Sequence, residues 1–123
     1  MAERRDVNRA ELAGAGVLGF CGVAASAASA HAAGDPRLMG AAGLVCLTHA
    51  AALLAFGFAG RHEFVLRLAA LALFAGPALF SADMAMRAFE NDHLFAYAAP
   101  AGGMTMMAGW LAVVVSVFIL RRD

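Results

Sequence analysis

Apolar residues fill four long stretches of this chain, and short polar segments separate them. The stretches cover residues 11–33, 38–60, 64–86 and 96–120. Each has about 23–25 residues, and a helix of that length spans ~35 Å, more than the ~30 Å hydrocarbon core of a bilayer. Because a segment that crosses a bilayer must satisfy its own backbone hydrogen bonds, each stretch is predicted to be a transmembrane helix.

The polar connections are too short to let successive helices run in the same direction. The first, Gly34-Asp35-Pro36-Arg37, has the glycine and proline that are typical of a turn. Short connections force neighbouring helices to be antiparallel. We therefore predict an all-α integral membrane protein in which residues 1–123 form a single domain, an up-and-down bundle of four transmembrane helices.

The composition supports a membrane protein and argues against a nucleic-acid partner. Hydrophobic residues make up 63% of the chain, against roughly 45–50% apolar residues in soluble domains. So short a chain cannot hide that much apolar surface in a soluble core. The formal net charge is zero, and no basic tract suggests DNA or RNA binding. Membrane lipids are the expected surroundings.

The arginines predict the orientation of the helices. If the helices alternate in direction, Arg37 and Arg87 lie on one side of the membrane and the other arginines on the opposite side. Those others are Arg4, Arg5, Arg9, Arg61, Arg67, Arg121 and Arg122. The positive-inside rule then places both termini in the cytoplasm. The use of arginine without lysine, in an alanine-rich chain, indicates a GC-rich bacterial genome and hence the inner membrane.

Asp83 is the most informative polar residue because it lies inside the third apolar stretch. Arg87 follows at i+4, the spacing at which helical side chains meet. A charge inside a membrane is costly unless it is paired or faces the protein interior. His31, at the same end of the first helix, is expected to lie close to Asp83. The group is either a structural ion pair or a ligand or proton site.

His49 lies near the middle of the second helix, where its ring should be neutral and hydrogen-bonded. It is either a satisfied core residue or part of a proton relay. A haem shared with His31 is disfavoured, because the two residues differ in depth by roughly 13 Å at 1.5 Å per residue. Cys46 shares a helix face with His49, but a closed metal site needs about four ligands. We therefore expect no metal and no cofactor.

Small residues recur every four positions in three of the predicted helices. The stripes are Gly22, Ser26 and Ala30; Ala42, Cys46 and Ala50; and Ala101, Thr105 and Gly109. Such stripes let helix backbones approach closely in lipid. They predict either packing within the bundle or a contact with a second copy or another subunit.

Several short motifs together resemble a known family. They are His31 after an Ala/Ser-rich helix, Thr48-His49-Ala50-Ala51-Ala52-Leu53-Leu54, Leu79-Phe80-Ser81-Ala82-Asp83, Pro100-Ala101-Gly102-Gly103 and Gly109-Trp110. Their order and spacing resemble the domain of unknown function 423 family, which includes transmembrane protein 256. The resemblance implies a four-helix integral membrane protein and no particular activity. In that family a glycine usually stands where this chain has Ser29, and an aromatic residue often stands where it has Thr48.

The sequence contains no phosphate loop, nucleophile elbow or zinc-binding spacing. We therefore expect a non-enzymatic accessory or assembly subunit, which contacts lipids, a larger membrane complex or further copies of itself. The alternative is a small transporter or channel protomer that uses His31, His49 and Asp83. A membrane enzyme is the third hypothesis.

Overall fold

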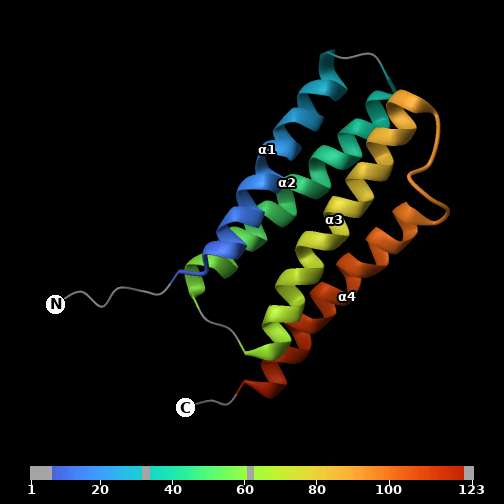
Figure 1. Ribbon diagram of the computed structural model, residues 1–123. Coiled ribbons are helices and arrows are strands. Elements are labelled where there is room, and N and C mark those ends of the chain that lie inside the picture. The colour runs from blue at the N-terminus through green and yellow to red at the C-terminus, as the bar shows by residue number, and fades with distance from the viewer. Residues whose placement is uncertain (1–6, 32–33, 61–62, 121–123) are drawn as a thin grey trace.

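A computed structural model describes residues 7–31, 34–60 and 63–120 of the chain and consists there of four helices (Figure 1). They are α1 (Arg9–His31), α2 (Pro36–Ala59), α3 (Phe64–Glu90) and α4 (Ala98–Ile119). Each is long and apolar enough to cross a membrane. The predicted all-α fold with four membrane-spanning helices is therefore confirmed.

Most helix boundaries differ from the predicted ones by one to four residues, and two of these differences have clear local reasons. α2 begins at Pro36, because the Asp35 side chain accepts a hydrogen bond of 2.9 Å from the Arg37 backbone N–H and caps the helix. α3 continues four residues beyond the predicted 86, to Glu90. It ends at Asn91, whose φ of 53° lies in the left-handed region that terminates helices.

The helices are arranged in a row in chain order (Figure 1). α1 packs on α2, α2 on α3 and α3 on α4, while α1 also makes a minor contact with α3. In the described part of the chain, α1 and α4 do not pack on each other. The α1–α2 and α3–α4 connections lie together at one end, which we call the hairpin end (Figure 1). The opposite end, where α1 begins and α4 stops, is called the terminal end.

Glycines create the closest helix contacts, and these fall within the two hairpins. A Cβ atom added to Gly43 of α2 would lie 3.2 Å from the Gly22 carbonyl oxygen of α1. A Cβ atom on Gly76 of α3 would lie 2.9 Å from the Gly102 carbonyl oxygen of α4. In both pairs the backbones approach so closely that a side chain does not fit without a shift. The fold is thus two tightly packed hairpins placed side by side.

The predicted small-residue stripes have mixed outcomes. Gly22 and Ser26 face α2, and Gly109 packs on Leu73 of α3. The second stripe, formed by Ala42, Cys46 and Ala50, is buried. Ala30, however, is exposed, and the half-buried Ala101 and Thr105 lie beside the α4 face that packs on α3. That face is formed by Ala98, Ala99, Gly102, Met106 and Gly109. The small residues that are buried therefore serve packing inside the protein.

Candidate functional site

Asp83 is fully buried, and two groups of the same chain bind its carboxylate. The Arg87 Nε–H donates to one oxygen at 2.9 Å, and the Leu94 backbone N–H donates to the other at 2.8 Å. Arg87 is the i+4 partner predicted from the sequence. Leu94 belongs to the connection between α3 and α4. Asp83 therefore ties this connection to α3 and neutralises its own charge with an adjacent cation.

The position of Asp83 differs from the predicted one in depth and in its neighbours. Because α3 extends to Glu90 and not only to the predicted residue 86, Asp83 lies seven residues, or ~10 Å, inside the helix end instead of three residues. The predicted closeness of His31 to Asp83 does not take the form of a direct bond. His31 is exposed, and no hydrogen bond or ion pair joins it to Asp83 within the described residues. α1 and α3 do meet near this end, where Ala25 shares a hydrophobic cluster with Met84, but the Asp83 carboxylate binds groups in α3 and the α3–α4 connection.

His49 forms a second polar cluster, which connects α2 to α4. Its Nδ1 lies 2.8 Å from the Val45 carbonyl oxygen, and the Trp110 indole N–H donates to its Nε2 at 3.1 Å. A carbonyl only accepts hydrogen bonds, so the proton is on Nδ1. An indole N–H only donates, so Nε2 carries the lone pair. The geometry therefore defines one neutral tautomer of His49.

The two rings also contact each other directly. Their centroids are 5.8 Å apart and the ring planes meet at 61°, an edge-on arrangement. Trp110 was not predicted as a site residue. Its position in the sequence does indicate a polar contact, because the N–H of a tryptophan deep inside a membrane segment needs an acceptor. The acceptor could not be identified from the sequence, since 61 residues separate Trp110 from His49.

Loss of the indole N–H should weaken the α2–α4 contact. Trp110→Phe keeps an aromatic ring but leaves His49 Nε2 without its donor, so we expect the free energy of unfolding to fall by about 1 kcal/mol. Chemical unfolding in mild detergent measures this loss. In a His49→Leu background the same change should cost little, because the hydrogen bond is already absent. Equal losses in both backgrounds would contradict the assigned bond.

The two polar clusters are separate from each other. His49 lies 13 residues, or ~20 Å, from the start of α2 at the hairpin end, whereas Asp83 lies ~10 Å from the end of α3 there. A third polar contact joins α2 to α3. Its two atoms, Cys46 Sγ and Ser81 Oγ, are 3.0 Å apart. Hydrogen bonds between described residues do not connect His49 to Asp83. Within the described residues, His49 and Asp83 thus belong to two separate hydrogen-bonded clusters.

The described residues contain no group of three or more His, Cys, Asp or Glu side chains that could hold a metal ion. Cys46 is buried, Cys21 is exposed, and both are free thiols. Neither cysteine forms a site with His49, whose ring nitrogens face Val45 and Trp110.

Residues of the family motifs other than His31 lie close together in space. His49 binds Trp110, Ser81 contacts Cys46 beside the His49 motif, and Gly102 packs against Phe80. Comparison with protein families matches residues 25–103 to DUF423, described as a protein of unknown function. The chain belongs to the DUF423 family. This confirms the resemblance inferred from the motifs and leaves the activity open. Comparisons with curated proteins and with solved structures found no match.

The matched region contains most of the residues of the two polar clusters. Within the DUF423 chain, the matched residues include Asp83, Arg87, Leu94 and His49, but they end before Trp110. The match also contains the whole of α2 and α3, which form the middle of the row. The residues that hold α3 to its following connection are therefore part of the family region.

Proposed function

We propose that this DUF423 protein is a non-enzymatic accessory or assembly subunit that binds another membrane helix through the outer face of α4. The observation that supports this is the exposure of that face. Over an apolar 18-residue segment of each helix, the buried share is smallest for α4, at 17%. Its exposed side carries large apolar residues at alternating spacings of three and four: Met104, Met107, Leu111, Val114 and Phe118. This spacing is that of a helix–helix seam.

The polar clusters support a structural role over transport. Both ring nitrogens of His49 and both carboxylate oxygens of Asp83 are engaged by groups of the same chain. A conduction path needs polar groups at successive depths that are free to bind the transported species. The engaged state of His49 and Asp83 favours packing over a relay. The docking proposal also moves the contact surface from the small-residue stripes, which serve internal packing, to the large side chains of α4.

Photo-crosslinking tests this docking surface. A photoreactive residue at Met107 or Leu111 should give a discrete crosslinked protein in native membranes, because both positions face away from α3. Leu44, which is similarly exposed on α2, is the matched control and should give only diffuse lipid products. The mass of the adduct distinguishes another protein from a second copy of this chain. Equal products at Leu44 and Met107, or none at either, would remove the support for α4.

We further propose that the protein lies in a bacterial inner membrane with both termini in the cytoplasm. Among the described arginines, Arg9 and Arg67 lie at the terminal end, and Arg37 and Arg87 at the hairpin end. The predicted excess at the terminal end thus rests on Arg4, Arg5, Arg61, Arg121 and Arg122, which lie outside the described residues. Reporter fusions after residue 123 and near Asn91 should report cytoplasmic and periplasmic locations respectively. The reverse pattern would contradict the orientation.

Reconstituted vesicles separate this function from the transporter alternative. Purified protein should produce no proton or solute flux above that of empty vesicles. Flux that disappears in His49→Ala, in a variant shown to remain folded, would favour the transporter. Asp83→Asn provides a second arm, because it removes the charge but keeps a carboxamide oxygen for Leu94.

A further inference from the structure

α4 begins well below the level at which the neighbouring α3 ends. A Cβ atom on Gly102 of α4 would lie 2.8 Å from the Phe80 backbone nitrogen of α3, so these two residues are level. The two helices are antiparallel, so Ala98, four residues before Gly102, is level with about residue 84 of α3. Glu90, the last residue of α3, lies ~9 Å farther out. The connection between the helices therefore runs back down beside the end of α3 (Figure 1).

The connection changes from polar to apolar as it descends. The polar part comes first and the apolar part second: Asn91-Asp92-His93, then Leu94-Phe95-Ala96-Tyr97. We call residues 94–97 the descending segment. Its large side chains belong to exposed residues, and Tyr97 is 80% exposed. Packing inside the protein thus does not account for them. A change from polar to apolar side chains with depth is the change from water to lipid at a membrane surface.

The backbone of the descending segment finds hydrogen-bond partners within the chain. The Leu94 N–H donates to the buried Asp83 carboxylate at 2.8 Å. The Phe95 and Tyr97 carbonyl oxygens accept from N–H groups in the first turn of α4 at 3.2 and 2.9 Å. Water is scarce below the lipid headgroups, and a backbone group without a partner is costly there. Asp83 thus supplies an acceptor at a depth where water is in short supply.

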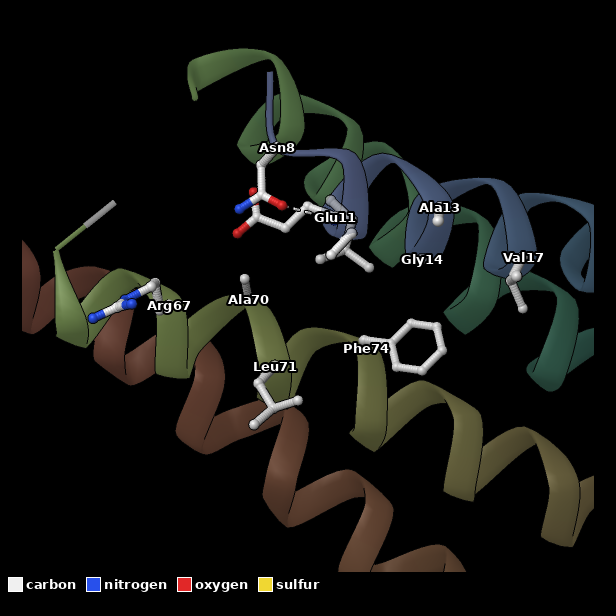
Figure 2. A pocket seen from close by; sticks show the side chains of 11 residues that line it. Asn8, Glu11, Ala13, Gly14, Val17, Arg67, Ala70, Leu71 and Phe74 are labelled. Atoms are coloured by element: carbon white, nitrogen blue, oxygen red, sulfur yellow. Dashed lines mark hydrogen bonds between the residues drawn. The ribbon is translucent and has the colours of Figure 1, made fainter. Parts of the chain in front are cut away.

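The arginines of α3 place the descending segment at the membrane boundary. At the terminal end, Arg67 lies near the polar start of α1, and the apolar Leu71 and Phe74 follow it along α3 (Figure 2). A hydrocarbon core ~30 Å thick corresponds to about 20 residues of helix, so a boundary near Arg67 puts the other one near Arg87. The descending segment lies beside the last two turns of α3, which include Arg87. Irregular backbone exposed to lipid does not occur inside the hydrocarbon, so the segment belongs at the boundary and not below it.

We propose that the descending segment is an interfacial anchor, which inserts Leu94, Phe95 and Tyr97 among the lipids at the hairpin end. Their side chains lie at the boundary between the headgroups and the acyl chains, where tyrosine is enriched in membrane proteins. Asp83 holds the segment at this depth through its bond to Leu94. The partner is the lipid surface itself, so the anchor requires neither the docking of another helix on α4 nor a particular orientation of the protein.

Depth-dependent fluorescence quenching tests the anchor. The full-length protein is reconstituted in phosphatidylcholine vesicles in a Trp110→Phe background, so that each introduced tryptophan is the only indole. Phe95→Trp and Tyr97→Trp are compared with Asp92→Trp in the polar part and with Met107→Trp near the middle of α4. We expect blue-shifted emission from the first two, strong quenching by a lipid spin-labelled just below its headgroup, and weak quenching by aqueous iodide. Asp92→Trp should respond mainly to iodide, and Met107→Trp to a label near the acyl-chain ends.

Two results would overturn the proposal. If iodide quenches Phe95→Trp and Tyr97→Trp as strongly as Asp92→Trp, the descending segment lies in water. Because the vesicles contain no other protein, a segment that is covered by a protein partner and not by lipid gives this same result. If the label near the acyl-chain ends quenches them most, the segment lies inside the hydrocarbon and not at its boundary.

The bond between Asp83 and Leu94 is tested with the same measurement. Asp83→Leu should increase iodide quenching of Phe95→Trp, because the Leu94 N–H loses its acceptor and the segment is released. Asp83→Asn, which keeps an oxygen for Leu94, should give a smaller increase. Quenching of Met107→Trp should not change, which shows that α4 remains in place. Unchanged quenching of Phe95→Trp in Asp83→Leu would overturn the role of Asp83, and the depth measured with Asp83 intact decides the location even if Asp83→Leu unfolds.

Discussion

Replacement of Asp83 by leucine is expected to lower the free energy of unfolding by about 3 kcal/mol, the lower part of the range for a broken buried ion pair. The lower part applies because the Arg87 side chain is 34% exposed, whereas Asp83 is fully buried. The change removes the acceptor of the Arg87 Nε–H and that of the Leu94 N–H together. Chemical unfolding in mild detergent, followed by circular dichroism, measures the loss.

Glu90→Leu is the matched control for Asp83→Leu. Glu90 is exposed at the last residue of α3, so its replacement should change the free energy of unfolding by no more than about 0.5 kcal/mol. Asp83→Asn should fall between the two, since its oxygen can accept from Leu94 while its amide group does not pair with Arg87. If Asp83→Leu lowers the free energy of unfolding no more than Glu90→Leu does, the Asp83 carboxylate does not stabilise the α3–α4 connection.

Addition of one methyl group at Gly102 should cost about 2 kcal/mol, as is usual for overpacking. A Cβ atom there would lie 2.8 Å from both the Gly76 carbonyl oxygen and the Phe80 backbone nitrogen. These are backbone atoms, so α3 and α4 must separate to make room. The chain has a single tryptophan, and Trp110 lies on α4 against His49. Its fluorescence should therefore shift in Gly102→Ala as α4 moves.

The adjacent glycine provides the control for this prediction. A Cβ atom on Gly103 meets nothing within 4 Å. Gly103→Ala should therefore leave the fluorescence unchanged and make the protein equally or more stable, because alanine is favoured over glycine in helices by up to about 1 kcal/mol. Similar losses in Gly102→Ala and Gly103→Ala would mean that the α3–α4 interface adapts without cost.

The features that were predictable from the sequence are those that depend on neighbours along the chain. Continuous apolar stretches identify membrane helices because the bilayer imposes a minimum length. The pair of Asp83 and Arg87 follows from their i, i+4 spacing alone. The extension of α3 to Glu90 was not predicted, because residues 87–90 include two charged side chains and the predicted helix was ended where the apolar stretch ends.

The features that were missed depend on how the helices are rotated and ordered. The bonds from Trp110 to His49 and from Leu94 to Asp83 join different elements. α4 carries small residues on more than one side, so spacing alone did not distinguish Ala101 and Thr105 from the packed Gly102 and Gly109. The expected approach of His31 to Asp83 assumed that the first and third helices face each other at this end. Ala25 of α1 does share a hydrophobic cluster with Met84 and Ala88 of α3, but the Asp83 carboxylate binds Arg87 and Leu94, and His31 is exposed.

The two tight hairpins have a consequence for the order in which the protein is made. The close approach of Gly22 and Gly43 becomes available as soon as α1 and α2 have left the ribosome, and contacts between segments close in the chain form early. The close approach of Gly76 and Gly102 becomes available in the same way once α3 and α4 have been made. The α2–α3 interface uses larger side chains such as Leu53 and Leu73, and it joins two units that are already formed. The protein is thus expected to enter the membrane as two successive pairs of helices that then associate laterally.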